Sequence, residues 1–226
     1  MYDLINFPVK LKFGPNSPKN IRKGLIKVNL MMNYLAHAFL SFGNPSILTG
    51  NIISDFIKGR RIYSYNDDIL KGIRLHRAID DFTDHHSSTK AIKKYFSPHY
   101  GLYASVFTDI AYDYFIANDK KVFENIESLE KFSLICYDQL DQNYIYFPEE
   151  FKRVYASMKQ HNWLYNYHLV SGIEFSFRGI DSRAKYMSDY TTAFEIFLKH
   201  KEQLQKYYNP FFSEIRLFAK LTLQQL

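Results

Sequence analysis

Glycine and proline are scarce in this chain, and their scarcity limits the folds that it can adopt. Only 9 glycines and 7 prolines occur among 226 residues, whereas 46% of the residues are hydrophobic and 18% are aromatic. A turn-rich β architecture needs many such breakers, while long helices contain few. The apolar content is ample for one packed core, and the length fits one domain. We therefore expect a single all-α domain with a bundle-like arrangement of helices.

The few breakers and the acidic residues suggest where helices begin and end. Pro45 predicts a helix start because proline is favoured in a first turn, and Gly59 predicts the end of that helix. Asp67 and Asp68 suit the N-terminus of the next one. The expected helices are 47–58, 67–87, 102–117, 123–146, 148–167, 171–178, 187–207 and 211–226.

Two prolines are expected to interrupt helical structure. Pro98, together with Gly101, predicts a loop before the apolar segment 102–117. Asn209-Pro210 is expected to separate the last two helices, because proline removes a backbone hydrogen bond and clashes with the preceding turn.

The first 31 residues differ from the rest of the chain. They hold six bases and one acid, or +5 of the total charge of +6, so residues 32–226 are nearly neutral. Nucleic-acid binding is therefore not expected of the body of the chain. The segment lacks the pattern of a signal peptide. It is either a poorly ordered basic extension or a mis-assigned start, with translation beginning at Met31 or Met32; we favour the second interpretation.

Cys136 is the only cysteine. It cannot form an internal disulfide or a cysteine-based zinc site, and its apolar neighbours predict a buried core thiol. No apolar run is long enough to predict a membrane span. The simplest inference is a protein of a reducing, cytoplasmic compartment.

The stretch 72–85 contains the pattern most suggestive of chemistry. His76, Asp80 and Asp84 are spaced i, i+4, i+8, so in a helix they share one face. An imidazole and a carboxylate one turn apart can bind the same divalent ion. A solvated polar face with a His–Asp pair would show the same spacing, so both interpretations remain open.

Other segments offer further candidate ligands in apolar surroundings. Asp55 lies between apolar neighbours, and Asp109 and Asp113 lie one turn apart, where like charges repel unless a cation separates them. The alternative is that these acids are simply exposed. His37 is a further candidate, although a lone histidine in an apolar helix is more often a core group. Oxygen and nitrogen donors without sulfur suit Mn²⁺, Mg²⁺ or another divalent ion.

Several blocks together resemble the acyl carrier protein phosphodiesterase family. They keep the order and rough spacing of that family, although each block alone is weak. Tyr114 stands where the family has a histidine, which argues against a ligand or base role at that position. The blocks are 32–37 (MNYLAH), 50–56 (GNIISDF), 72–84 (GIRLHRAIDDFTD), 108–115 (TDIAYDYF) and 179–183 (GIDSR).

The resemblance implies an all-helical domain over 32–226 that is related to the HD phosphohydrolases. It implies Mn²⁺ dependence and hydrolysis of holo-acyl carrier protein to apo-acyl carrier protein and 4′-phosphopantetheine, within fatty acid and lipid metabolism. It strengthens Asp55, His76 and Asp80 as the core of a metal site, with Asp109 and Asp113 as additional ligands.

On this hypothesis, other side chains assist the reaction or bind the partner. Asp84 would act as general acid or base. Arg77 or Arg183 would offset charge on the phosphodiester oxygens. An acidic carrier protein would dock on exposed bases; ordinary solvated charge is the alternative for these bases, which are Lys58, Arg60, Arg61, Lys71, Arg74 and Arg77.

Two other functions remain compatible with the sequence. The same ligands would serve an HD-like phosphohydrolase that acts on a nucleotide or another small phosphodiester. A non-enzymatic helical binding module is the second alternative, and it would bind no metal. The oligomeric state is not indicated by any of these patterns.

Overall fold

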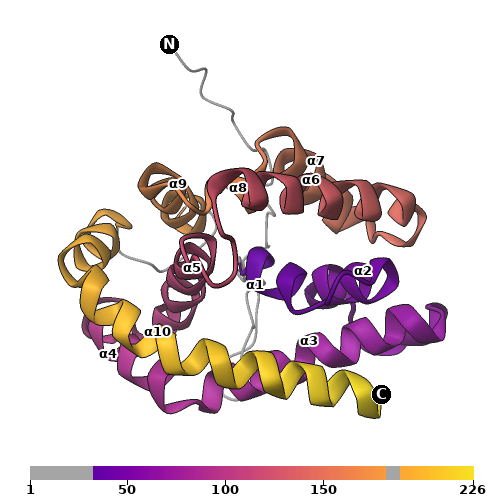
Figure 1. The fold of residues 1–226 in the computed structure, drawn as a ribbon, viewed down its shortest axis with the longest axis horizontal. Helices are drawn as coiled ribbons and strands as arrows, with labels where there is room; N and C mark the ends of the chain where they lie inside the picture. The colour runs from indigo at the N-terminus through magenta and orange to yellow at the C-terminus, as the bar shows by residue number, and fades with distance from the viewer. Residues whose placement is uncertain (1–32, 182–188) are drawn as a thin grey trace, which may run out of the picture.

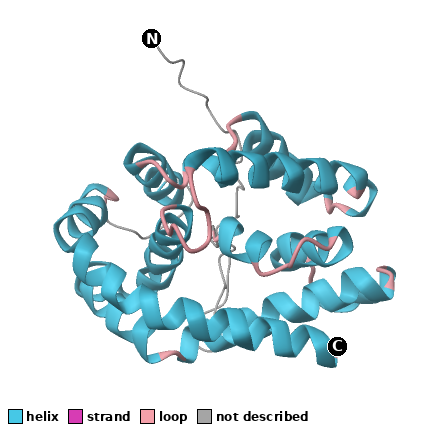
Figure 2. Ribbon diagram, in the orientation of Figure 1, coloured by secondary structure: helices cyan, strands magenta, loops and turns pink. Residues whose placement is uncertain are grey.

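The structure is a computed structural model that describes residues 33–181 and 189–226. All regular elements in this part of the chain are helices, as Figure 2 shows, which confirms the all-α prediction. The proposed extension 1–31, Met32 and Arg183 lie outside the described residues. The α-helices are α1 (Tyr34–Phe39), α2 (Pro45–Ile53), α3 (Asp67–His85), α4 (Ser87–Tyr100), α5 (Ala104–Ala117), α6 (Ile126–Gln142), α7 (Glu149–Gln160), α8 (Trp163–Asn166), α9 (Val170–Asp181) and α10 (Thr191–Gln225).

Four short 3-10 helices connect some of these elements. They are η1 (Ser54–Phe56), η2 (Gly59–Ser64), η3 (Gly101–Tyr103) and η4 (Tyr144–Tyr146).

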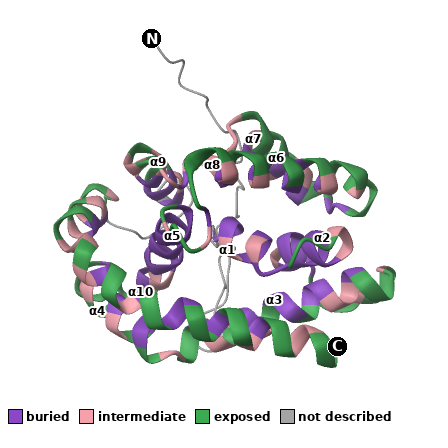
Figure 3. Ribbon diagram, viewed as in Figure 1, coloured by how far each residue is buried: buried purple, intermediate pink, exposed green. Residues whose placement is uncertain are grey.

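Helices α1, α2 and α5 lie between two outer groups (Figure 1). Helix α10 runs along α3 and α4 on one side, while α6, α7 and α8 lie on the opposite side. Helix α5 is buried on all faces from Val106 to Ala117, as Figure 3 shows. A helix surrounded in this way is mostly apolar on every face, and its few polar side chains, Asp109 and Asp113 among them, are buried with it.

Asparagine caps fix the starts of α2 and α3, the helix before Asp55 and the helix that carries His76 and Asp80. The Asn44 side-chain oxygen accepts hydrogen bonds from the backbone N–H groups of Ser46 and Ile47, at 3.0 and 3.1 Å. The Asn66 side chain accepts one from the N–H of Ile69 at 2.9 Å. Such caps satisfy N–H groups that have no partner within the helix, and each contributes about 1 kcal/mol.

The backbones of α2 and α3 cross in contact at two glycines. A Cβ atom on Gly50 would lie 2.1 Å from the carbonyl oxygen of Ile69, and one on Gly72 would lie 2.4 Å from that of Ile47. Only glycine fits at either position. The crossing holds the end of α2, and η1 after it, against the middle of α3.

The predicted break at Asn209-Pro210 is wrong, because α10 continues through Pro210 as one 35-residue helix. A proline inside a helix costs about 3 kcal/mol. The residues around it, Tyr208, Phe211, Phe212 and Ile215, are buried on one face. Burial of each such side chain contributes roughly 1.5–3 kcal/mol, which outweighs the cost of the proline.

Other boundaries also differ from the expectations. Pro98 lies inside α4, a helix that was not predicted, and Gly101 ends it with φ of 52°. Segment 148–167 is divided into α7 and α8 at Asn162, whose left-handed φ of 41° stops the first helix. Segment 123–146 is shorter as α6 and is followed by η4. The prediction for Cys136 is confirmed, because it is a free and buried thiol.

None of the described helices is both long and apolar enough to cross a membrane.

Candidate metal centre

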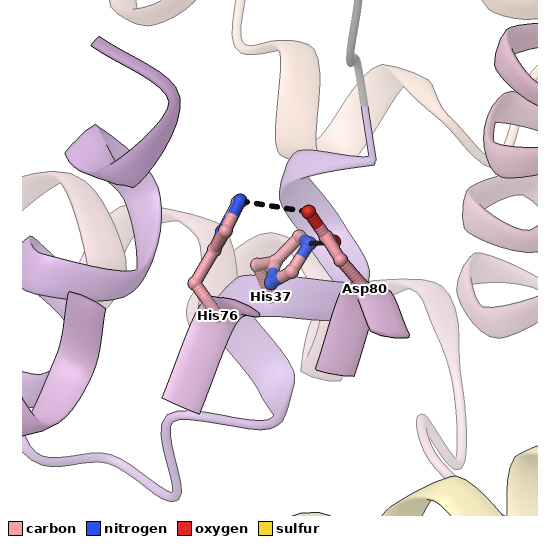
Figure 4. Close-up of side chains that lie close together, drawn as sticks. All are labelled: His37, His76 and Asp80. Carbon is pink, nitrogen blue, oxygen red and sulfur yellow. Dashed lines mark ion pairs between the residues drawn. The ribbon is translucent and has the colours of Figure 1, made fainter. Parts of the chain in front are cut away.

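Two histidines and one carboxylate, from α1 and α3, meet below the surface (Figure 4). His37, His76 and Asp80 each place one ligand atom within 4.8 Å of the others. The Nε2 atom of His37 lies 3.3 Å from Oδ1 of Asp80, and the Nε2 atom of His76 lies 3.2 Å from Oδ2. The two imidazole rings stack with their centroids 4.1 Å apart. Each oxygen of the Asp80 carboxylate thus faces an imidazole nitrogen.

Asp55 adds a second carboxylate from η1. Its Oδ1 atom lies 3.4 Å from Nε2 of His76. The side chain of Asp55 is 22% exposed and that of Asp80 is 12% exposed, whereas those of both histidines are almost fully buried. The centre therefore opens to solvent on the side of its carboxylates. Because the glycine crossing holds η1 next to α3, the Asp55–His76 contact follows from the packing of α2 on α3.

The imidazole nitrogens have unmet bonding capacity. Nε2 of His37 and both ring nitrogens of His76 are buried without a hydrogen-bond partner in the described part of the chain. Ligands that share one ion at about 2.0–2.2 Å lie about 3.0–3.5 Å from each other. The histidine–carboxylate spacings of 3.2–3.4 Å fall in this range, and the ligand atoms of His37, His76 and Asp80 all lie within 4.8 Å of one another. The residues therefore fit a divalent cation.

The electrostatics of the centre also suit a cation. Burial alone lowers the pKa of His76, but the carboxylates of Asp80 and Asp55 more than offset it and raise that pKa to about 10. Burial raises the pKa of Asp80, yet the two histidines outweigh burial and hold that pKa well below its usual range. Burial and the charge of His76 lower the pKa of His37. Without a metal ion, a proton on His76 supplies the positive charge beside these carboxylates, and a bound metal ion would replace that proton.

Asp109, on α5, is near this centre but outside its closest group. It is buried beside a small apolar cavity lined by Ala36, Ile79 and Thr83 among others. Burial, and then the charge of Asp80, raise the pKa of Asp109 well above its usual range.

Asp113 has a different environment, although it lies one turn from Asp109. Its Oδ2 accepts a hydrogen bond from the N–H of Leu35 at 3.2 Å, and its Oδ1 accepts one from the N–H of Ala36 at 2.8 Å. Burial raises the pKa of Asp113, while these two N–H groups and the Tyr167 hydroxyl oppose that shift. The carboxylate therefore caps α1, the helix that carries His37, and is not brought to the cluster.

Most of the remaining candidates lie at the surface, whereas Tyr114 is buried in α5. Asp84 is 54% exposed and pairs with Nζ of Lys93 at 2.8 Å. Arg77 is exposed on α3, next in sequence to His76. Tyr114 packs edge-on against Phe197, with ring centroids 5.2 Å apart. The exposed bases of the two expected clusters are Lys58, Arg60, Arg61, Arg74 and Arg77, with Lys71 half-buried.

One residue of this region is not indicated by the pattern of acids and histidines. Asn51 is fully buried and hydrogen-bonds to His37. Its sequence signals are its place in the block 50–56 and its position four residues before Asp55, which would place both on one face of a helix. His37, treated above as a secondary candidate, belongs to the closest group.

Comparisons with known proteins identify the family of this chain. A protein-family model described as acyl carrier protein phosphodiesterase matches residues 32–215. A protein named acyl carrier protein phosphodiesterase from Photorhabdus laumondii is 30% identical over 169 residues, which cover 75% of this chain and 85% of that protein. Proteins of the same name from Pectobacterium atrosepticum and Serratia proteamaculans are 26% and 28% identical over 189 residues, which cover 84% of this chain and 98% of each relative.

No solved structure shows a significant match to this chain. The family match spans most of the chain and includes all four residues of the centre, His37, Asp55, His76 and Asp80. The chain therefore belongs to the acyl carrier protein phosphodiesterase family, a family of phosphoric diester hydrolases.

Proposed function

We propose that this protein hydrolyses holo-acyl carrier protein to apo-acyl carrier protein and 4′-phosphopantetheine, and that it needs a divalent metal ion to do so. The names of the relatives support the substrate. The observation that carries the metal dependence is the meeting of His37, His76 and Asp80, with Asp55 beside them. A reducing cytoplasmic location agrees with the single free thiol, Cys136.

The proposed ligands are His37, His76 and Asp80, with Asp55 as the more exposed fourth. Nitrogen and carboxylate donors suit Mn²⁺, and such a set also accepts Mg²⁺ or another divalent ion. When bound, such an ion makes water a stronger nucleophile and offsets negative charge on a phosphodiester. Asp113 is left out of the proposed set because both of its oxygens already accept backbone hydrogen bonds.

Other side chains on α3 would act on the substrate. Arg77 follows His76 and is exposed, so its guanidinium can hydrogen-bond to the non-bridging oxygens of a bound phosphodiester. Asp84 lies one turn after Asp80 and is exposed, so it is the proposed group that moves a proton to or from the reacting oxygens. Lys93 holds the carboxylate of Asp84 in place.

The test is a mass-shift assay on holo-acyl carrier protein. The wild-type protein with Mn²⁺ should release 4′-phosphopantetheine, and a chelator should stop the release. Asp80→Asn, which keeps the shape of the side chain but removes its charge, should lose turnover while keeping its helical circular dichroism. Full activity of Asp80→Asn, or activity unaffected by the chelator, would refute the proposal.

Two further measurements, hydrolysis of a small free phosphodiester and binding of divalent ions, separate the alternatives. A small free phosphodiester, cleaved while holo-acyl carrier protein is not, would indicate the HD-like phosphohydrolase. Failure to bind any divalent ion, together with no hydrolysis, would indicate the non-enzymatic binding module.

The exposed bases near the centre are the proposed docking surface for an acidic carrier protein. Lys58, Arg60 and Arg61 follow Asp55, and Arg74 and Arg77 flank His76 in sequence. Charged surfaces of opposite sign accelerate encounter, and salt screens this effect. We expect kcat/KM for holo-acyl carrier protein to fall about tenfold or more between 50 mM and 500 mM salt, with less change in kcat. A kcat/KM that is insensitive to salt would exclude such steering.

A further inference from the structure

Asn51 is a fully buried amide whose hydrogen bonds are all made next to the candidate metal centre. Its Oδ1 atom lies 2.6 Å from Nδ1 of His37. Its Nδ2 group donates to the backbone carbonyl oxygen of His37 at 2.9 Å and to Oγ of Ser41 at 3.1 Å. The Ser41 hydroxyl in turn donates to the same His37 carbonyl at 2.7 Å. Asn51 on α2 is thus bonded to both the backbone and the ring of His37 on α1.

These contacts fix which end of the amide faces the ring. A carbonyl oxygen only accepts hydrogen bonds, so the end of Asn51 that contacts the His37 carbonyl must be the NH₂ group. The other end, which faces the imidazole, is then the side-chain oxygen. Reversing the amide would place two oxygens in contact inside the core, where an unsatisfied polar group costs about 1–3 kcal/mol.

The orientation of the amide fixes the proton on the ring. Because Oδ1 of Asn51 only accepts, Nδ1 of His37 must donate, so a neutral His37 carries its proton on Nδ1. Its Nε2 atom then has a free lone pair, and this is the nitrogen that points to Asp80 at 3.3 Å. An electron pair that faces a carboxylate is unfavourable by itself and becomes favourable when a cation lies between them.

We propose that Asn51 is a positioning residue that holds His37 in the Nδ1-protonated tautomer, so that Nε2 is available as a metal ligand. This inference rests on the proposed metal centre. Ligand histidines usually donate their second ring N–H to such a partner, which sets tautomer and ring orientation. His76 provides a contrast within the same centre, because its Nδ1 atom is buried without a hydrogen-bond partner among residues 33–181 and 189–226.

The test compares Mn²⁺ binding and ring protonation in three variants. Asn51→Leu removes the acceptor while keeping the branched shape of the side chain, and it should weaken Mn²⁺ binding about 10–100-fold, the usual effect of losing such a partner. Asn51→Asp keeps an acceptor for Nδ1–H but turns its second oxygen toward the His37 carbonyl, so it should be less stable than wild type and yet bind Mn²⁺ more tightly than Asn51→Leu. Ser41→Ala breaks the two bonds that its hydroxyl makes to Asn51 and to the His37 carbonyl but leaves the bond to the ring, so its affinity should stay within about twofold of wild type. Electron paramagnetic resonance of free Mn²⁺ reports these affinities.

Imidazole ¹⁵N NMR of the metal-free protein tests the tautomer directly. The neutral His37 ring should show its proton on Nδ1 in the wild type and lose this preference in Asn51→Leu. A wild-type proton on Nε2 would overturn the inference, as would a folded Asn51→Leu that binds Mn²⁺ as tightly as wild type. If Asn51→Leu does not fold, the wild-type spectrum alone decides. None of these measurements depends on holo-acyl carrier protein, so failure of the proposed substrate would not be mistaken for failure of the tautomer assignment.

Discussion

Asp109 and Asp113 lie one turn apart on α5 and are both buried, yet their partners differ. Asp113 accepts two backbone hydrogen bonds at the start of α1. Asp109 lies beside an apolar cavity, where burial and the charge of Asp80 raise its pKa well above the usual range. The i, i+4 spacing could not distinguish the two acids, because it contains no information about the helices that pack against each of them. The structure assigns one of them to support the helix that carries His37.

Replacing Asp113 by alanine should destabilise the protein through α1. The N–H groups of Leu35 and Ala36 would lose their acceptor inside the core, at a cost of about 1–3 kcal/mol. Urea denaturation measures the loss, and Mn²⁺ affinity should fall with it because α1 carries His37. Asp113→Asn keeps one acceptor oxygen and should lose less. The exposed Asp81→Ala should change stability by no more than about 0.5 kcal/mol, and an equally small change in Asp113→Ala would contradict the capping role.

The crossing of α2 and α3 links the packing of two helices to the geometry of the centre. Gly50 and Gly72 let the two backbones touch. Asp55 follows the end of α2 and reaches His76, one turn after Gly72 on α3. Any side chain at the crossing must push the helices apart and so separate these two ligands.

Gly50→Ala tests this link. The added Cβ would lie 2.1 Å from the carbonyl oxygen of Ile69, and backbone cannot yield as a flexible side chain can. We expect a loss of stability of about 1–3 kcal/mol or more, together with weaker Mn²⁺ binding, in thermal melts and titrations. Ser97→Ala, on the exposed face of α4, is the matched control and should melt like wild type. A Gly50→Ala protein with unchanged melting temperature and Mn²⁺ affinity would show that the contact is not restrictive.

Helical structure could be predicted from the sequence where local signals agree with packing. Scarce breakers predicted the all-α fold, and Pro45 and Asp67 marked two helix starts correctly. The helix break predicted at Pro210 was wrong, because burial of the aromatic side chains on both sides of the proline outweighs its free-energy cost in a helix. Only the packed structure shows this burial. The left-handed turn at Asn162 likewise has no strong local signal.

The candidate site could be predicted only in part. The i, i+4 spacing predicted that His76 and Asp80 share one face, and they do. The approach of His37 and Asp55 depends on how α1 and α2 pack against α3, which spacing does not encode. Asn51 could not be recognised because an amide becomes informative only when its hydrogen-bond partners are known. The proposed relation to HD phosphohydrolases stays a prediction.

Across the whole protein, segments far apart in sequence converge on one small polar centre inside an aromatic-rich core. Helix α5 supports α1 through Asp113, α2 supports it through Asn51, and α3 supplies His76 and Asp80. Carboxylates and imidazoles this deeply placed are costly unless something of positive charge offsets them. We propose that a divalent cation bound by His37, His76 and Asp80 supplies this charge.

Anomalous scattering from crystals of the full chain grown with Mn²⁺ tests this claim most directly. Data collected at the manganese absorption edge should show a strong peak bounded by Nε2 of His37, Nε2 of His76 and the carboxylate of Asp80. The peak should vanish in crystals of Asp80→Asn grown under the same conditions. A well-diffracting crystal with manganese bound only elsewhere, or with no anomalous peak at these three side chains, would contradict the account.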